Sequence, residues 1–535
     1  MNPTTDAART EHLVVSMTER MTTLTRTLSS WMQQQEQEHS LAEVEQHVVR
    51  VLKELGASLV AGLCSLAAAK QPSPNVTCSC GQQAAYQRER KAQVTTLLGP
   101  ISICRPYYLC AACGQGQHPL DAQLQFCAGS RSAALDELLA LLGATQDSFV
   151  QAAQVLERLT LVHVSANSVR DATEELGALL LEHQAQPKTQ PEPCPPPRPS
   201  ATAKATRLYI TMDGVLAHLH ERGWSEIKVG CCYQTRSRVD RKRPERLEIR
   251  ADSASYLTAL EEAQNFGWRL WHEALRRGVL SSDEVVVLGD GAHWIWNIAE
   301  RHFPQAIQIV DWYHASEYVW QAASAIWGEA NPERSSWAHC QLDALWEGKV
   351  AQVLLELEQW RASGEAVEAA RSYYSEHQAR MDYASYREKG LQIGSGSVES
   401  ACKQLVSARL KQAGMIWDAA GAEAVAAVRA WLKSERWEEA IALRSPRRRS
   451  YRRKQDDWQS ERSECQGQVA KQQAKVPDKP LAKGWRQELT EEVLAQVQAE
   501  LAEQRSKNAW VKAWSVQRQR ELAAQREEQR PRMLA

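Results

Sequence analysis

The stretch DEVVVLGDGAHWIWNIAERHFPQAIQIVDWYH, residues 283–314, constrains the fold more than any other part of the chain. Two short apolar runs, at 285–288 and 306–310, flank a segment of helical length at 292–303. This alternation predicts two parallel strands joined by a crossover helix. Asp290 and Asp311 each follow one of the runs. Because ligands of open α/β sheets collect at the carboxyl ends of the strands, we expect both aspartates at a functional edge.

Glycines stand on both sides of Asp290, and they leave room for a ligand to approach the backbone closely. An aspartate in this setting is a candidate metal ligand. The same position also suits a plain helix N-cap, so the pattern alone leaves both interpretations open.

Length and composition point to a multidomain globular chain. At 535 residues, three or four domains of roughly 150 residues are expected. No apolar run approaches the roughly 20 residues that span a bilayer, and no charged-then-apolar leader opens the chain, so we expect a cytoplasmic protein without membrane partners. Its 13 cysteines are then expected to be reduced, and closely paired ones point to metal. The 64 basic and 65 acidic residues nearly cancel, so global charge does not decide for or against a nucleic-acid partner.

Residues 1–70 are expected to be helical, and residues 71–127 have the pattern of a zinc ribbon. Two short cysteine pairs, each followed by glycine, lie on either side of a β-rich stretch; the predicted zinc ligands are Cys78, Cys80, Cys110 and Cys113. Zinc takes four such ligands in a tetrahedron, and short pairs supply two from each tight turn. The alternative is a set of buried free thiols. Cys104 and Cys127 are expected to be packing residues.

Residues 128–182 predict helices in a helix-turn-helix-like DNA-binding region, with one helix at about 149–159 and a second beginning after Ser165. Asn167, Ser168 and Arg170 would then face bases or phosphates. An ordinary αα-hairpin fits the same pattern. A proline-rich linker is expected at 183–205.

Residues 206–443 predict an RNase H-like catalytic core with an all-α insertion at about 315–390. Strands are expected at 207–212, 224–233 and 245–251, followed by a helix at 254–277 and the strand–helix–strand unit described above. The segment between the second and third strands is basic and suits a phosphate backbone, or else it is a solvated turn; its cations are Arg236, Arg238, Arg241, Lys242 and Arg243.

A helix is expected to begin near Val398 and to carry Glu399 in its first turn. Glu399 and Lys403 are four residues apart, so a surface salt bridge is one interpretation. In the functional interpretation, Glu399 is a metal ligand and the helix contacts DNA through Lys403, Arg409 and Lys411. The chain ends in a basic, helical or disordered extension at 444–535.

Asp213, which follows the first strand of the core, completes a set of three carboxylates with Asp290 and Glu399. Such a set can hold two Mg²⁺ or Mn²⁺ ions for in-line displacement at phosphorus.

Several longer motifs carry a family resemblance. They are TMDG (211–214), VVVLGDGAHWIWN (285–297), QIVDWYHASEYVW (308–320), GSGSVESACKQLV (394–406), YYLCAACGQG (107–116) and GAEAVAAVRA (421–430). With these motifs the chain resembles bacterial insertion-sequence DDE transposases of the ISKra family, in the Mutator-like superfamily. The resemblance spans roughly residues 78–440. It implies Asp213, Asp290 and Glu399 as the catalytic triad, Asp311 as a supporting residue, and His314 at the scissile DNA.

The resemblance implies a DNA transposase that binds the terminal inverted repeats of its own element and joins them to target DNA. It implies Mg²⁺-dependent strand cleavage and strand transfer, a homo-oligomer on double-stranded DNA, and a bacterial cytoplasmic protein that is nucleoid-associated when bound. Two alternatives stay open at this point. One is an RNase H-like nuclease without strand transfer, and the other is a DNA-binding regulator derived from a transposase.

Overall fold

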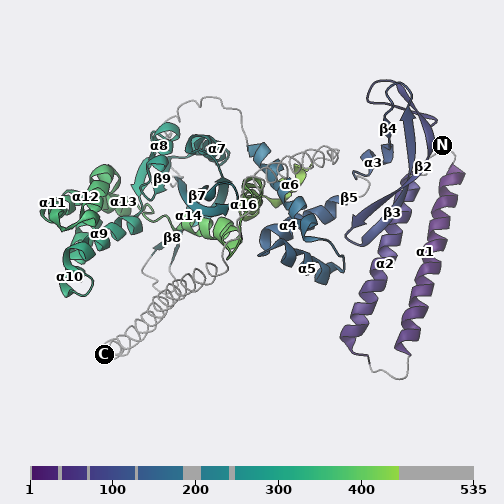
Figure 1. Cartoon of the computed structure of the whole chain (residues 1–535), viewed down its shortest axis with the longest axis horizontal. Coiled ribbons are helices and arrows are strands. Elements are labelled where there is room, and N and C mark those ends of the chain that lie inside the picture. Colours follow the sequence, from purple (N-terminus) through teal and green to yellow (C-terminus); the bar gives the residue numbers. More distant parts are fainter. Residues whose placement is uncertain are drawn as a thin grey trace, which may run out of the picture. The chain divides into compact units, whose positions relative to one another are not determined.

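The computed structural model describes residues 3–33, 39–68, 73–126, 130–184, 207–239 and 247–444. Within these ranges the chain is a mixture of helices and two five-stranded sheets (Figure 1). No helix in them is long and apolar enough to cross a membrane. The linker from residue 185 to 206 and the extension from residue 445 onward lie outside these ranges.

Two long helices, α1 (Pro3–Met32) and α2 (Leu41–Ala68), form an antiparallel hairpin. A capping box begins α2, because the Ser40 backbone N–H donates to Glu43 at 2.8 Å and the Glu43 backbone N–H donates to the Ser40 hydroxyl at 3.3 Å. The ring of Trp31 stacks on His39 and His47, each at 4.0 Å between ring centroids. These contacts fix the turn end of the hairpin.

The first sheet packs on α2 and has the strand order β1-β2-β3-β4, with β5 paired to β2. Its strands are β1 (Asn75–Thr77), β2 (Gln83–Thr96), β3 (Gly99–Cys110), β4 (Gly116–Gln117) and β5 (Ser130–Arg131). Val94, Ile101 and Ile103 are buried against the Ala61 face of α2. A short helix, α3 (Pro119–Gln123), is tied to β3 by an ion pair between Arg105 and Asp121.

Three helices follow, each begun by a serine whose hydroxyl accepts a backbone N–H. They are α4 (Ala133–Thr145), α5 (Phe149–Thr160) and α6 (Ala166–Gln184), with Ser132, Ser148 and Ser165 as the caps. Helix α6 packs closely on α16 (Ala419–Lys433): a Cβ at Gly177 would lie 2.2 Å from the backbone oxygen of Ala424. Leu176 and Leu180 in the last half of α6 are therefore buried in a cluster with Val428 and Trp431 of α16.

The second sheet has the strand order β10-β9-β6-β7-β8. Strands β6, β9 and β10 are parallel, whereas β6, β7 and β8 are joined as antiparallel neighbours. The bounds are β6 (Arg207–Leu219), β7 (Gly223–Val239), β8 (Leu247–Ala259), β9 (Glu284–Gly289) and β10 (Ile307–Val310). The crossover helix predicted between the last two strands is α8 (His293–His302), so the strand–helix–strand unit is present.

The first three strands of this sheet are longer than predicted. Strand β8 continues to Ala259, and α7 (Ala263–Arg276) begins only after it, so the helix predicted from residue 254 was wrong over its first residues. The pairing explains the difference, because Leu257 and Ala259 stand opposite Gly230 and Lys228 of β7. That long-range pairing overrides the local helical pattern.

A wholly helical segment separates β10 from the helix that carries Glu399. It comprises α9 (Trp312–Trp327), α10 (Pro332–Trp346), α11 (Val350–Gln359), α12 (Glu365–His377) and α13 (Tyr383–Glu388). Most of its tyrosines and tryptophans belong to the core of the second sheet, whereas Tyr313 and Trp346 are exposed. The chain then forms α14 (Gly396–Ala401), the π-helix η4 (Cys402–Ser407), α15 (Ala408–Leu410), α16 and α17 (Trp437–Ala442).

Candidate active site

Asp213 lies on β6 of the second sheet, and Asp290 directly follows the neighbouring strand β9. The parallel register pairs Thr211 with Leu288, so each aspartate stands two residues beyond the last pair of β6 and β9. The prediction that Asp213 follows its strand was wrong, because β6 continues past this residue and pairs Asp213 with Val229 of β7. The sheet therefore narrows beside Asp213, where β9 has ended and β6 has not.

Asp290 closes the turn that follows β9. Its carboxylate accepts the backbone N–H of Ala292 at 2.9 Å, and Ala292 itself occupies the N-cap position of α8. The plain N-cap interpretation of Asp290 was therefore wrong. The backbone carbonyl of Asp290 accepts the hydroxyl of Tyr373 at 2.7 Å, which ties this turn to α12 of the helical segment.

Asp311 is fully buried and is the N-cap of α9, where its carboxylate accepts the His314 backbone N–H at 2.9 Å. The backbone N–H of Ser395 donates to its second oxygen. Burial alone would raise the pKa of Asp311, but the hydrogen bonds from His314 and Ser395 hold it below its usual range. Asp311 thus fastens the loop that leads to α14 onto the end of β10.

The imidazole of His314 lies 3.3 Å from the Asp311 carboxylate, measured from Nδ1 to Oδ1. That contact raises the pKa of His314 to about 9, and the nearby charge of Asp290 adds to the effect. His314 is therefore a cation at neutral pH. Its charge balances part of the negative charge of the surrounding carboxylates.

Glu399 lies in the first turn of α14 and joins Asp311 and His314 in a group whose ligand atoms all lie within 4.8 Å of one another. Asp213 and Asp290 are not members of this tight group. The salt-bridge interpretation of Glu399 also has a basis, because Lys403 Nζ lies 3.9 Å from its carboxylate. Both side chains of that pair are open to solvent, so the ion pair is weak.

Asp213 is held by groups that the sequence did not single out. Burial raises the pKa of its carboxyl, and the charge of Asp290 raises it further, whereas the Gly214 backbone N–H and the Cys402 thiol lower it. The Cys402 sulfur lies 3.6 Å from Asp213 Oδ2. Burial raises the pKa of Cys402 far above its usual value, so it stays a neutral thiol donor. Cys402 begins the π-helix η4, a rare local structure that is frequent at functional sites.

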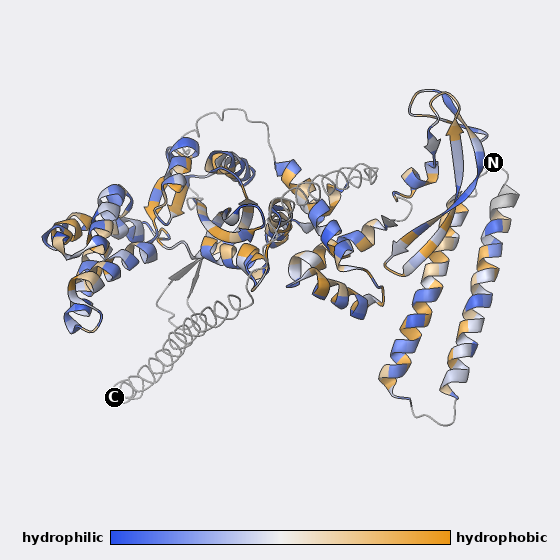
Figure 2. Cartoon of the chain, viewed as in Figure 1, coloured by the Kyte–Doolittle hydropathy of each residue, from blue (hydrophilic) through white to orange (hydrophobic). Residues whose placement is uncertain are grey.

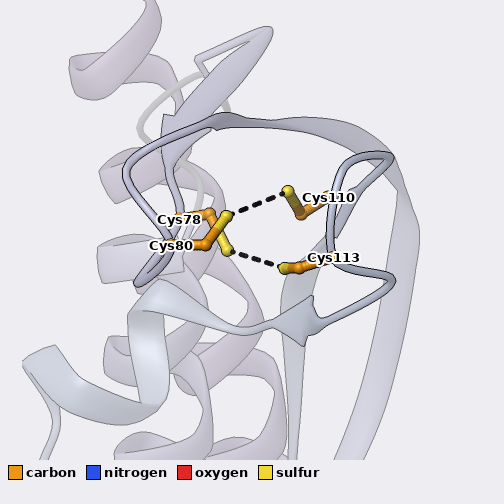
Figure 3. A group of neighbouring side chains, drawn as sticks. All are labelled: Cys78, Cys80, Cys110 and Cys113. Atoms are coloured by element: carbon orange, nitrogen blue, oxygen red, sulfur yellow. Dashed lines mark hydrogen bonds between the residues drawn. The ribbon is translucent and has the colours of Figure 1, made fainter.

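The four predicted cysteine ligands of the first sheet also come together (Figure 3). Cys78 and Cys113 have their sulfurs 3.5 Å apart, and those of Cys80 and Cys110 are 3.7 Å apart. A backbone hydrogen bond at Cys80 lowers the pKa of Cys78 to about 6, which favours a thiolate. The group can therefore hold one zinc ion. Cys104 is half-buried and outside the group, and Cys127 lies outside the described residues.

A family model described as "Uncharacterised protein family (UPF0236)" matches residues 34–440. The chain belongs to this family. No curated protein matches the sequence significantly. The UPF0236 match covers the group of four cysteines, both sheets and all the candidate active-site residues.

Besides His314 and Arg409, the predicted DNA contacts of this UPF0236 chain fall into three classes. Asn167 and Arg170 on α6, and Lys403 and Lys411 near α14 and α15, are exposed. Arg236 and Arg238 belong to β7, so the predicted basic loop begins later than expected. Arg241, Lys242 and Arg243 lie outside the described residues.

Arg409 was wrongly predicted to contact DNA, because its side chain is 1% exposed. Its guanidinium lies 4.5 Å from the ring centroid of Phe149 and 4.9 Å from that of Trp417. It donates to the backbone carbonyl of Gly143 at 3.3 Å. Arg409 therefore joins α15 to α4 and α5, and it is not available to a phosphate.

Proposed function

We propose that the chain is a DNA transposase of the DDE type, a member of the ISKra family, whose second sheet is an RNase H-like catalytic core. The observation that carries the proposal is the gathering of five acidic or imidazole groups at one edge of that sheet. They are Asp213, Asp290, Asp311, His314 and Glu399. Three antiparallel strands followed by two parallel ones, with a helix crossing between the parallel pair, support the RNase H-like assignment.

Asp213, Asp290 and Glu399 would hold Mg²⁺ or Mn²⁺. Two observations fit a divalent cation there: the charge of Asp290 adds to burial in raising the pKa of Asp213, and the charges of Asp213 and Glu399 both add to burial in raising the pKa of the Cys402 thiol. Crowded carboxylates of this kind favour a cation between them. When bound, the ions lower the pKa of the attacking water or 3′-hydroxyl and stabilise the leaving oxygen.

The residues around these ligands would position them and the DNA. Cys402 and the Gly214 N–H hold the Asp213 carboxylate, and Asp311 holds both His314 and the loop that begins α14. The cationic His314 would contact a phosphate next to the scissile bond. Lys403 and Lys411, which are exposed, would contact phosphates further along the duplex.

Recognition of the terminal inverted repeats falls, in this proposal, to the first sheet and to α4–α6. The four cysteines would form a zinc ribbon, and Asn167 and Arg170 at the exposed start of α6 would face DNA. In the full reaction, two or more copies of the chain would cleave each end of the element and join its 3′-hydroxyl to target DNA. Both steps are displacements at phosphorus, so one site serves both.

Strand transfer from pre-cut ends of the encoding element and cleavage of uncut ends, with purified protein and Mg²⁺, test the proposal, with Asp290→Asn beside the wild type. We expect the wild type to join the ends to a plasmid target and Asp290→Asn to bind them without joining. Cutting without joining would favour a nuclease instead. Binding of ends by both proteins, with neither cutting nor joining, would favour a DNA-binding regulator.

A further inference from the structure

An uncovered apolar stripe runs along α2. Its members are five large aliphatic residues that are at least one third exposed: Leu41 (75%), Val48 (36%), Leu52 (57%), Leu59 (42%) and Leu63 (52%). Their spacings alternate between seven and four residues, so they follow one line along the helix. Soluble proteins rarely leave a continuous apolar surface of this length uncovered.

The remaining sides of α2 are already occupied. One side meets α1 so closely that a Cβ at Gly62 would lie 2.4 Å from Leu13 Cδ1. Another side places Val60, Ala61 and Cys64 against the buried residues of the first sheet. The stripe is therefore a third face, which no other part of the described residues covers.

Helix α1 extends this face near the turn of the hairpin. Thr25, Leu28 and Met32 of α1 line a groove of about 290 Å³ together with Val44 and Val48 of α2. Met32 is 48% exposed, and Val48 belongs to the stripe. Apolar residues recur along both helices in Figure 2. The hairpin thus offers a two-helix layer with an apolar ridge and an adjoining groove.

We propose that this face binds the same face of a second copy of the chain, so that two α1–α2 hairpins form a four-helix bundle. The inference does not depend on the proposed transposase activity. The two copies are expected to associate through this face in the absence of DNA.

Charge favours a second copy over nucleic acid. Helix α1 carries three acidic and three basic residues, and α2 carries three acidic and two basic residues. The hairpin is therefore nearly neutral. Two copies meet without repulsion between net charges, whereas a polyanion would find no basic excess here.

The spacing of the stripe also suits a two-fold axis. Leu52 is its midpoint, with Leu41 and Leu63 each eleven residues away. In an antiparallel pair of α2 helices, Leu52 would meet the partner's Leu52, and Leu41 would meet the partner's Leu63. Such an interface is self-complementary, as two-fold symmetry requires. Residues 41–63 span about 33 Å of helix, enough with α1 for an interface of roughly 800 Å² per copy.

The test uses the full chain without DNA and measures its mass by light scattering on a sizing column. The wild type is expected to elute at about twice the 60.1 kDa of one chain. Leu52→Glu and Leu52→Lys are each expected to elute as single chains, because like charges would meet at the axis. Mixing the two variants is expected to restore the double mass, because Glu then meets Lys. Leu355→Glu is the matched control, since Leu355 is 70% exposed on α11 and outside the face.

Orientation has its own test. A Leu41→Glu/Leu63→Lys double variant is expected to associate more tightly than Leu41→Glu/Leu63→Glu, because antiparallel pairing brings positions 41 and 63 together. Thermal unfolding confirms that each variant is folded. A single-chain mass for the wild type overturns the inference. So does a Leu52→Glu protein that keeps the double mass, or a mixture of Leu52→Glu and Leu52→Lys that stays dissociated. Strand transfer is measured separately, so a failed transposase assay leaves this result unaffected.

Discussion

Arg409 shows that a cation next to a candidate site can serve the fold and not the ligand. Its buried guanidinium contacts the rings of Phe149 and Trp417 and the Gly143 carbonyl in place of water. We expect Arg409→Ala to lower the free energy of unfolding by roughly 3 kcal/mol, mainly through lost packing. Chemical denaturation of the full chain measures the loss.

Lys411→Ala is the matched comparison, because Lys411 is exposed. It is expected to leave stability nearly unchanged and to reduce the salt dependence of DNA binding by about one phosphate contact. Equal stability of the two variants would contradict the buried role of Arg409.

His302 makes stability depend on pH. His302 is 2% exposed, and both of its ring nitrogens lack a hydrogen-bond partner among the residues that the structure describes. Burial lowers the pKa of His302 to about 4, against an ordinary value of 6.5, so the unfolded chain takes up a proton more readily. The stability associated with the neutral ring is complete above pH 6.5 and is lost as the pH falls toward 4.

Because of this histidine, the free energy of unfolding is expected to fall by about 2 kcal/mol when the pH is lowered from 7 to 5. His302→Gln removes that dependence, and urea unfolding at the two pH values measures it. His163→Gln is the control, because the His163 side chain is 80% exposed. If the wild type and His302→Gln lose the same stability between the two pH values, His302 is not the group responsible.

At the scale of single residues, the sequence predicted the positions of those residues that depend on a local pattern. Asp290 and Asp311 follow apolar runs, and both lie at the ends of β9 and β10. Cys402 and Tyr373 were missed because their partners are far away in the chain. Cys402 is 189 residues from Asp213, and Tyr373 is 83 residues from Asp290. A thiol or a hydroxyl carries no periodic signal of such a contact.

At the scale of elements, the cysteine group has the clearest local cause. Cys78 and Cys110 each begin a tight turn, and the glycines that close the turns, Gly81 and Gly114, have φ angles of 83° and 69°. A side chain is strained in that left-handed region, which explains glycine at both places. The spacing of the cysteines and glycines was therefore enough to predict both turns. Strand ends were less predictable, because the length of β8 depends on its pairing with β7.

We expect about one Zn²⁺ per purified chain, held by these four sulfurs. Cys113→Ser is expected to lose the ion, because it removes one ligand of the tetrahedron. Cys104→Ser is expected to keep it, because Cys104 lies outside the group. Atomic emission gives the zinc content, and circular dichroism shows whether chelation also unfolds the strands around the site. A wild type with much less than one ion after gentle purification would count against the zinc site.

At the scale of the whole molecule, the helical segment between β10 and α14 does more than separate two motifs. Three of its tyrosines donate hydrogen bonds to backbone carbonyls at or next to strand ends: Tyr373 to Asp290, Tyr383 to Val310, and Tyr386 to Gln308. The sequence indicated a helical insertion, but not that it holds the edge of the sheet. Length and aromatic content predict a core, whereas these contacts depend on how that core docks.

Tyr373 provides the test of this docking. Its ring lies so near Gly291 that a Cβ there would be 2.5 Å from Tyr373 Cε2, and Gly291 has a φ of 111°. Tyr373→Phe leaves the Asp290 carbonyl without its donor and is expected to cost about 1–2 kcal/mol of stability. Because the same turn orients the Asp290 carboxylate, we also expect cleavage to need several-fold more Mg²⁺ for half its maximal rate.

Tyr386→Phe supplies the matched control for Tyr373→Phe. It removes a 3.3 Å hydrogen bond to the Gln308 carbonyl on β10, away from Asp290. The stability loss should be similar or smaller, and the Mg²⁺ dependence of cleavage unchanged. The two effects separate because only one of the two carbonyls belongs to a candidate ligand. If both variants shift the Mg²⁺ dependence equally, general destabilisation explains the result. If neither does, the helical segment holds the sheet without orienting Asp290.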